Sequence, residues 1–230
     1  YDAIVQIILD VAKENGFEKL NKGLSPKQLE ALRETGAIDR ILFELAAGGG
    51  KTLVFVIQVV RKILIDGPAA GNSAIIVEKS AAKVNFIANM EGALLRSLGF
   101  KVEDANHLVT RYKELKGNSS PAAAAERFEI LEKLKDAHTV KVFSLEERGF
   151  LTGDLLGNKE LREAVASMRN VILDEAHLAT TAKETYLQSG GTGAEKSVYD
   201  SATVQRITEN RDFVLENARF GLKNAESGKL

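Results

Sequence analysis

Cysteine is absent from the 230-residue sequence, which excludes disulfide bonds and thiolate metal sites. The absence fits a reducing compartment, so we expect a cytoplasmic location, with a peripheral position at a membrane left open. Long apolar runs are also lacking: stretches such as 53–60 fall far short of the roughly 20 residues that span a bilayer. We see no signal peptide, and the sequence predicts no membrane-spanning segment.

An excess of charge of either sign is lacking too. The chain has 31 Lys and Arg against 32 Asp and Glu, for a net charge of −1. No global basic excess therefore indicates nucleic acid as a partner. The apolar content of 44% and charged content of 27% are typical of a soluble domain. Because the chain starts at Tyr1 rather than Met, we expect it to be a fragment of something longer.

The pattern that is present alternates strands with helices. Strands are expected at 38–45, 73–77, 139–143 and 170–173, with a short extended piece from 100, and helices at 2–14, from Ser25-Pro26, and at 52–65, 81–98, 122–136 and 161–167. This alternation predicts an α/β fold with a mostly parallel sheet covered on both faces. We expect one lobe over 1–182, N-terminal helices included.

The pattern weakens over 183–230. Residues 188–193 read as a linker, a polar helix is expected over about 200–220, and no further strand is predicted. We interpret 183–230 as a linker and a polar helical tail, or as the start of an insertion.

One glycine-rich stretch lies between a predicted strand and a predicted helix. Gly48, Gly49 and Gly50 run directly into Lys51 and Thr52. Glycines let backbone N–H groups turn around phosphate oxygens, and a helix N-terminus favours negative charge. In such a loop the lysine reaches the β- and γ-phosphates and the threonine holds Mg²⁺. The alternative is a flexible turn, because the strict pattern has a glycine where Leu45 stands.

A second element follows the apolar strand 170–173. Asp174 and Glu175 come directly after it, then Ala176 and His177. An Asp at the C-terminal end of a parallel strand can hold magnesium, and the next Glu can orient and deprotonate an attacking water. A helix start with acidic first-turn residues would suit the same letters. The two elements together, in this order, favour nucleotide binding.

These two motifs resemble motifs I and II of the superfamily 2 motor ATPases, the DEAD/DEAH-box class. The flanks at 44–54, 75–79, 98–102 and 140–151 are similar to those of SecA, the preprotein translocase motor. The resemblance covers roughly residues 20–180. It implies a RecA-like P-loop NTPase lobe with a three-layer αβα architecture.

The resemblance also implies site residues and ligands. ATP or ADP and Mg²⁺ are the expected cofactors, with Gly48, Gly49, Gly50 and Lys51 on phosphate, Thr52 and Asp174 on magnesium, Glu175 and Lys51 as catalytic residues, and His177 as a relay of nucleotide state. Gln28 matches the glutamine that reads the adenine edge in the family, since an amide offers both donor and acceptor. Gln28 is equally suited to a capping box with Ser25.

The sequence departs from the family at several positions. Ala47 replaces a common threonine and Gly49 a larger residue, so the loop is softer than usual. Motif III should be a Ser/Thr-Ala-Thr after an apolar strand; Ser201-Ala202-Thr203 has the letters, but its surroundings read as a helix start, so we interpret the match as coincidence. A second RecA-like lobe with an arginine finger is expected elsewhere in the full-length chain, so this fragment should hydrolyse ATP slowly.

Three functions remain open from the sequence. The first is a SecA-like motor lobe acting on polypeptide in protein transport, favoured by the flanks and the neutral charge. The second is the N-terminal lobe of a DNA or RNA helicase. After strand 73–77 the chain reads Glu78-Lys79-Ser80, without the helicase phosphate motif, although Lys79, Ser80 and Lys83 could still touch phosphates. The third is a regulatory nucleotide-binding module, against which the Asp174-Glu175 pair argues.

Overall fold

The computed structural model describes residues 2–17, 23–37, 40–44, 51–77, 79–144, 146–147, 158–174 and 196–201. The strands are β1 (Arg40–Glu44), β2 (Ser73–Val77), β3 (Lys101–Asp104), β4 (Thr139–Ser144), β5 (Asn170–Leu173) and β6 (Lys196–Ser201). The helices are α1 (Asp2–Glu14), α2 (Pro26–Ala37), α3 (Lys51–Asp66), α4 (Pro68–Gly71), α5 (Ser80–Ala88), α6 (Met90–Ser97), α7 (Ala105–Leu115), α8 (Pro121–Lys135) and α10 (Lys159–Ala166). In these segments no helix combines the length and the apolar character needed to cross a membrane.

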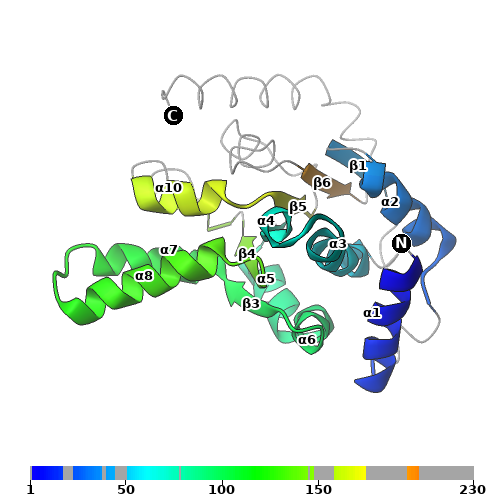
Figure 1. Ribbon diagram of the computed structural model, residues 1–230, viewed down its shortest axis with the longest axis horizontal. Coiled ribbons are helices and arrows are strands. Elements are labelled where there is room, and N and C mark those ends of the chain that lie inside the picture. Colours follow the sequence, from blue (N-terminus) through cyan, green and yellow to red (C-terminus); the bar gives the residue numbers. More distant parts are fainter. Residues whose placement is uncertain are drawn as a thin grey trace.

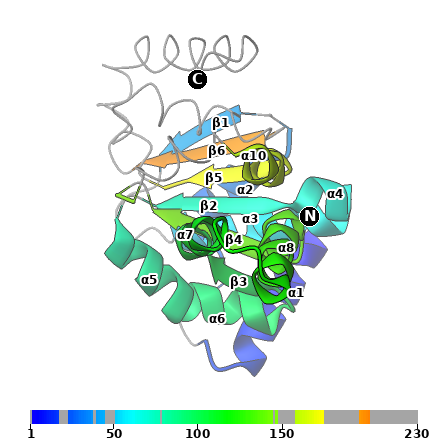
Figure 2. The same cartoon turned by 90° about the vertical axis from the view of Figure 1, so that its left-hand side faces the viewer.

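The strands form one six-stranded sheet in the order β1-β6-β5-β2-β4-β3, and every pairing is parallel. Figure 2 shows the strands stacked in this order with their arrows pointing the same way. Parallel strands need crossover connections, and helices supply them here. The α/β fold with a parallel sheet is therefore confirmed.

Each face of the sheet has its own apolar core, so the domain has three layers (Figure 1). Successive side chains of a strand point to opposite faces. In β2, Ala74 and Ile76 join the cluster beneath α7, α8 and α10, while Ile75 and Val77 join the cluster beneath α1, α2, α3, α5 and α6. Because both faces of a central strand are buried in apolar clusters, successive positions of the strand favour apolar residues. This explains why the central strands read as continuous apolar runs.

Helix α3 is buried all round over residues 53–60. It packs against β5 and against α1, α2, α4 and α6. The apolar run that is too short to span a membrane is thus the central helix of one layer.

The long helix expected over 81–98 is wrong: the structure has two helices, α5 and α6, separated at Asn89. The backbone of Asn89 is extended, with φ −95° and ψ −156°. Asparagine competes with the helix for backbone hydrogen bonds, which favours such a break. Gly92 makes the tight turn possible, since a Cβ there would lie 2.3 Å from the carbonyl oxygen of Ile87.

Helix α7 was not predicted, although the sequence contains its signals. The Asp104 side chain accepts a hydrogen bond from the backbone N–H of His107 at 3.0 Å and caps the helix. Leu108, Tyr112 and Leu115 repeat at helical spacing and are buried. The cap residue, Asp104, is also the last residue of β3, so the helix follows the strand with no loop between them. Because no loop separates the two elements, the boundary between them was hidden.

The expected absence of a strand after residue 180 is also wrong. β6 pairs with β1 on one side and with β5 on the other. Its residues, KSVYDS, are polar enough to read as a loop, and pairing on both sides decides their conformation instead of intrinsic propensity. Residues 196–201 thus belong to the sheet, while the rest of the segment 183–230 and the polar helix expected in it lie outside the described residues.

A buried polar network lies at the N-terminal edge of the sheet. Lys141 of β4 is fully buried, and its Nζ donates to Oδ1 of Asn72 and, at 2.8 Å, to the carbonyl oxygen of Asp136. The amide nitrogen of Asn72 donates to Oγ of Ser167 at 2.8 Å. Burial lowers the pKa of Lys141 to about 7, and the charge of Asp136 opposes this only in part.

Candidate functional site

The two sequence motifs meet the sheet at the same edge. β1 ends at Glu44, residues 45–50 follow, and α3 begins at Lys51. Since all strands are parallel, the C-terminal end of β5 lies at this edge too, and Asp174 follows it directly. The N-terminus of a long buried helix and a carboxylate thus share the edge at which ligands of open parallel sheets bind.

Asp174 is held in place through its backbone. Its N–H donates to the carbonyl oxygen of Ile76 at 2.9 Å, which extends the pairing of β5 with β2 by one residue. The residue is partly exposed. The backbone of the residue directly after β5 is thus fixed to the sheet, which suits a carboxylate that must hold a cation at a set distance.

β6 lies between the strands that carry the two motifs. Ser201 is the register partner of Glu44 on β1, and Tyr199 is the register partner of Leu173 on β5. The C-terminal end of β6 therefore lies between the ends of β1 and β5, the strands that precede the glycine-rich loop and Asp174 in the chain.

This position corrects the helix start that we expected around Ser201-Ala202-Thr203, while the interpretation of the match as coincidence stays a prediction. The surroundings read as a helix start in the sequence, yet Ser201 is the last residue of a strand. A Ser-Ala-Thr after a strand is the context in which we expected motif III. Ala202 and Thr203 lie outside the described residues.

Gln28 forms the capping box that the sequence suggested. Its Oε1 accepts from the backbone N–H of Ser25 at 2.7 Å, and its own N–H donates to Oγ of Ser25 at 3.3 Å. The residue is 6% exposed at the start of α2, which packs against α3 and β1. The capping role is confirmed, and the role in reading adenine stays a prediction.

Several predicted site residues are outside the described part of the chain: Gly48, Gly49, Gly50, Glu175 and His177, together with the side chains of Lys51 and Thr52. Among the residues that are described, no group of three His, Asp or Glu side chains could hold a metal by itself. A site that shares Mg²⁺ between one hydroxyl, one carboxylate and phosphate oxygens needs no such group.

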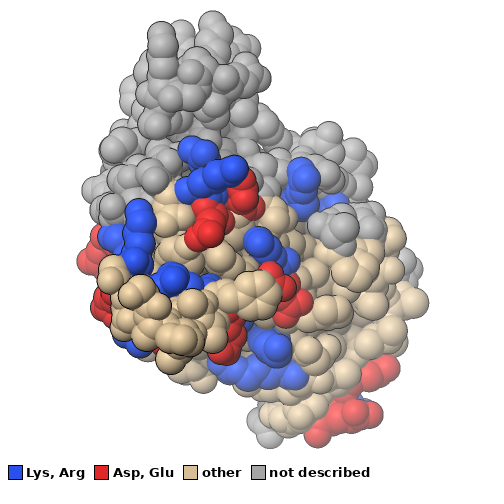
Figure 3. All heavy atoms as spheres, turned by 60° about the vertical axis from the view of Figure 1, so that its left-hand side comes forward, with Lys and Arg blue, Asp and Glu red and all other residues tan. Residues whose placement is uncertain are grey.

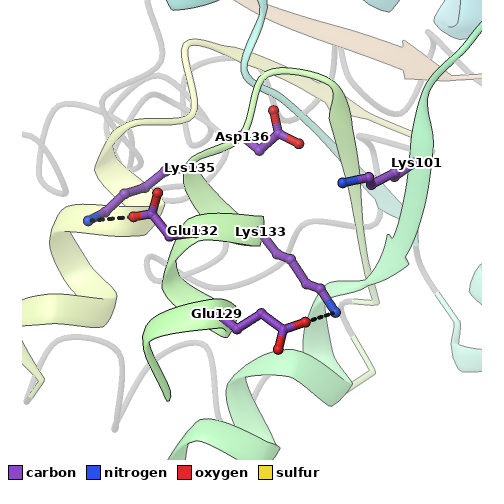
Figure 4. A pocket seen from close by; sticks show the side chains of 6 residues that line it. All are labelled: Lys101, Glu129, Glu132, Lys133, Lys135 and Asp136. Carbon is purple, nitrogen blue, oxygen red and sulfur yellow. Dashed lines mark ion pairs between the residues drawn. The ribbon is translucent and has the colours of Figure 1, made fainter. Parts of the chain in front are cut away.

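An open groove of about 470 Å³ lies at the opposite edge of the sheet, where β3 begins (Figure 4). Lysines and carboxylates face one another in it, with Lys133 3.3 Å from Glu129 and Lys135 4.0 Å from Glu132. Lys101 and Asp136 complete its lining. Burial alone would raise the pKa of Asp136, but hydrogen bonds from Thr139 and from the backbone of His138 lower it. The groove contains no predicted site residue and its charges balance.

Positive and negative side chains are interspersed on the described part of the face shown in Figure 3. Ion pairs join several charged side chains of the described residues; for example, Arg111 of α7 donates to both carboxylate oxygens of Glu126 on α8 at 2.7 and 3.0 Å. The described residues of this face therefore present no extended field of one sign.

The three layers, the all-parallel sheet and the motif-bearing strands on either side of β6 define a RecA-like αβα domain. The crystal structure of the DUF1998 helicase MrfA has a similar fold over 92% of this chain, with a TM-score of 0.59 and 15% sequence identity. The chain spans 31% of the length of that helicase. No family model matches the sequence, and no curated protein is significantly similar to it.

Proposed function

We propose that this chain is the nucleotide-binding lobe of a helicase-type motor, which binds Mg-ATP at the C-terminal edge of the sheet and uses its hydrolysis to move along nucleic acid. One observation carries the proposal: β1, which is followed by the glycine-rich loop and α3, and β5, which is followed by Asp174, flank β6 and end at the same sheet edge. The likeness of the fold to part of a helicase supports the motor class over a simple nucleotide-binding module.

In this proposal, different residues bind the phosphates, the Mg²⁺ ion, the attacking water and the adenine. The N–H groups of the glycine-rich loop and the first turn of α3 bind phosphate oxygens, with Lys51 as the cation. Thr52 and Asp174 hold Mg²⁺, which neutralises charge on the phosphates. Glu175 orients and deprotonates the attacking water, and Gln28 reads the adenine edge.

The segment after β6 has a place in this proposal. Ser201 ends β6, which lies between the strands that precede the phosphate loop and Asp174, and in this proposal a shift at that strand end follows from the presence or loss of the γ-phosphate. His177, three residues after Asp174, joins this segment as a relay to the rest of the motor. A relay of this kind needs a strand that ends next to the nucleotide. β6 suits this role, because it pairs with both strands that precede the motifs.

The reading as a SecA-like protein-transport motor is the weaker of the two. It rests on flanking letters alone, whereas the fold comparison favours the helicase reading. A direct competition separates them. Binding of a labelled single-stranded oligonucleotide is measured by fluorescence anisotropy with Mg-ADP present, and either unlabelled oligonucleotide or an unfolded polypeptide is added as competitor.

We expect unlabelled oligonucleotide to displace the label and the polypeptide to leave it bound. The Lys51→Ala variant serves as the nucleotide-site control: its anisotropy should no longer respond to Mg-ADP. Displacement by the polypeptide, or binding of polypeptide alone, would support the protein-transport reading and contradict ours.

A further inference from the structure

The first turn of α5 binds two carboxylates from a distant segment. The backbone N–H of Ser80 donates to Oε2 of Glu146 at 2.9 Å. Oγ of Ser80 donates to Oε1 of Glu147 at 2.8 Å, and Nζ of Lys83 donates to the same oxygen at 2.8 Å. An N–H, a hydroxyl and an ammonium group of one helix turn thus converge on two adjacent glutamates that follow β4.

Lys83 is nearly inaccessible, although it carries a charge. Its side chain is 3% exposed, and it also donates to Asp104 at 2.8 Å and to Oδ1 of Asn106 at 3.2 Å. Asn106 is 1% exposed, and its Oδ1 accepts a second bond from the N–H of Ser144. Its Nδ2 is buried and has no hydrogen-bond partner among the residues that the structure describes, so this cluster has a spare donor there.

The donors of this turn suit an oxyanion. The N-cap residue of α5, Lys79, makes no side-chain cap, so the first N–H group is satisfied from outside the helix by Glu146. Helix N-termini attract negative charge, and N–H, hydroxyl and lysine groups are the usual partners of backbone phosphates. Hydrogen bonds from Ser80 lower the pKa of Glu146, which keeps its carboxylate charged.

The cluster lies at the C-terminal edge of the sheet, beside β2 and β4, whereas the nucleotide motifs follow β1 and β5. β2 precedes α5 in the chain, and β4 precedes Glu146. In the sheet β2 lies between β5 and β4. The side chain of Glu147 is still 37% exposed. A polyanion at this edge therefore meets the two glutamates first, with the donors of α5 behind them.

We propose that Glu146 and Glu147 form an internal plug, which occupies the oxyanion-binding turn of α5 and must be displaced before the phosphates of single-stranded nucleic acid bind there. The inference rests on the proposed function, because it takes nucleic acid as the ligand. The plug makes the unstimulated chain a weak nucleic-acid binder, in line with its neutral overall charge.

The test neutralises the plug without removing its shape. In the Glu146→Gln, Glu147→Gln double variant the amide oxygens still accept hydrogen bonds, but they no longer compete as anions. Affinity for a labelled single-stranded thymidine oligonucleotide is measured by anisotropy from low to moderate salt. We expect the double variant to bind roughly tenfold more tightly at low salt and its salt slope to steepen by about one, the mark of added phosphate contacts.

Two controls separate the plug from general electrostatics. The Glu129→Gln, Glu132→Gln variant makes the same change of net charge on α8, in the groove at the opposite edge (Figure 4). We expect it to change affinity less than about twofold, since exposed charges beyond a Debye length are screened. Adding Lys83→Met to the double variant should abolish its gain, with thermal melting used to verify that each variant is folded.

Mg-ADP binding by the same samples distinguishes the two proposals. If the chain binds Mg-ADP and the plug variant gains no affinity for the oligonucleotide, the plug is wrong and the nucleotide site stands. An equal gain in the α8 control, or a gain for unfolded polypeptide instead, overturns the plug as well. Failure of Mg-ADP binding in every variant counts against the proposed function, whatever the oligonucleotide does.

Discussion

Ser201 of β6 lies level with Glu44 of β1, as its register partner at the C-terminal edge of the sheet. Within the described residues β1 pairs with no strand other than β6. β6 therefore connects β1, the strand that precedes the glycine-rich loop in the chain, to the rest of the sheet. A nucleotide site built on β1 depends on a segment that reads as a polar tail in the sequence.

Truncation tests this dependence. We expect a chain that ends at residue 182 to melt at least about 10 °C below the full chain, because β1 loses its described partner strand and β5 loses one of its two. Thermal unfolding followed by circular dichroism is the measurement. A chain that ends at residue 204 retains β6 and is the matched control. Equal melting temperatures for the 182-residue chain and the full chain would contradict the role of β6.

Lys141 makes stability depend on pH. Burial lowers its pKa from 10.5 to about 7 in the folded state, so between these values the unfolded chain binds the proton and the folded chain does not. The contribution of this group to stability therefore rises with pH over that window. We expect the free energy of unfolding of the wild type, relative to Lys141→Met, to increase by about 2 kcal/mol or more from pH 7 to pH 10.

The measurement for Lys141 is urea denaturation at several pH values. Lys135→Met removes an exposed lysine nearby and is the control, whose pH profile should follow that of the wild type. Parallel profiles for the wild type and Lys141→Met would show that burial does not lower the pKa of the Lys141 amine.

The strands and the two motif positions could be predicted from the sequence, because apolar runs such as 73–77 and 170–173 carry their own signal. β6 could not, since Val198 is its only aliphatic residue and its conformation depends on partners far away in the chain. The break at Asn89 was hidden because apolar periodicity continues through it. The contacts of Lys83 with Glu147, and of Lys141 with Asn72, join residues more than sixty positions apart, for which a single sequence has no signal.

Gln28 is suited to two roles, and two substitutions separate them. Ser25→Ala removes the cap and should cost about 1 kcal/mol of stability without changing nucleotide preference. Gln28→Ala should also lower the affinity for Mg-ADP by about fivefold, the value of roughly one hydrogen bond, while leaving Mg-GDP unchanged. Calorimetric titration with both nucleotides gives the comparison. If Gln28→Ala behaves as Ser25→Ala does, Gln28 is only a capping residue.

Hydrolysis by the isolated chain is expected to be slow. The resemblance puts an arginine finger in a second lobe, and such a finger contributes roughly 10³ to 10⁵ in rate. Phosphate release under multiple-turnover conditions measures this, with Glu175→Gln as the control that should lower the residual rate and preserve binding of Mg-ATP. Fast turnover by residues 1–230 alone would mean that the site is complete without a second lobe.

The most direct test of the account is calorimetric titration of the chain with Mg-ADP, beside Lys51→Ala. We predict that the wild type binds with a stoichiometry near one and that the variant does not bind measurably, although both melt at the same temperature. The start of α3 and Asp174 would then belong to one phosphate and magnesium site at the C-terminal edge of the sheet. Binding that is equal in both proteins, or absent in both, would contradict the nucleotide site on which the proposed function rests.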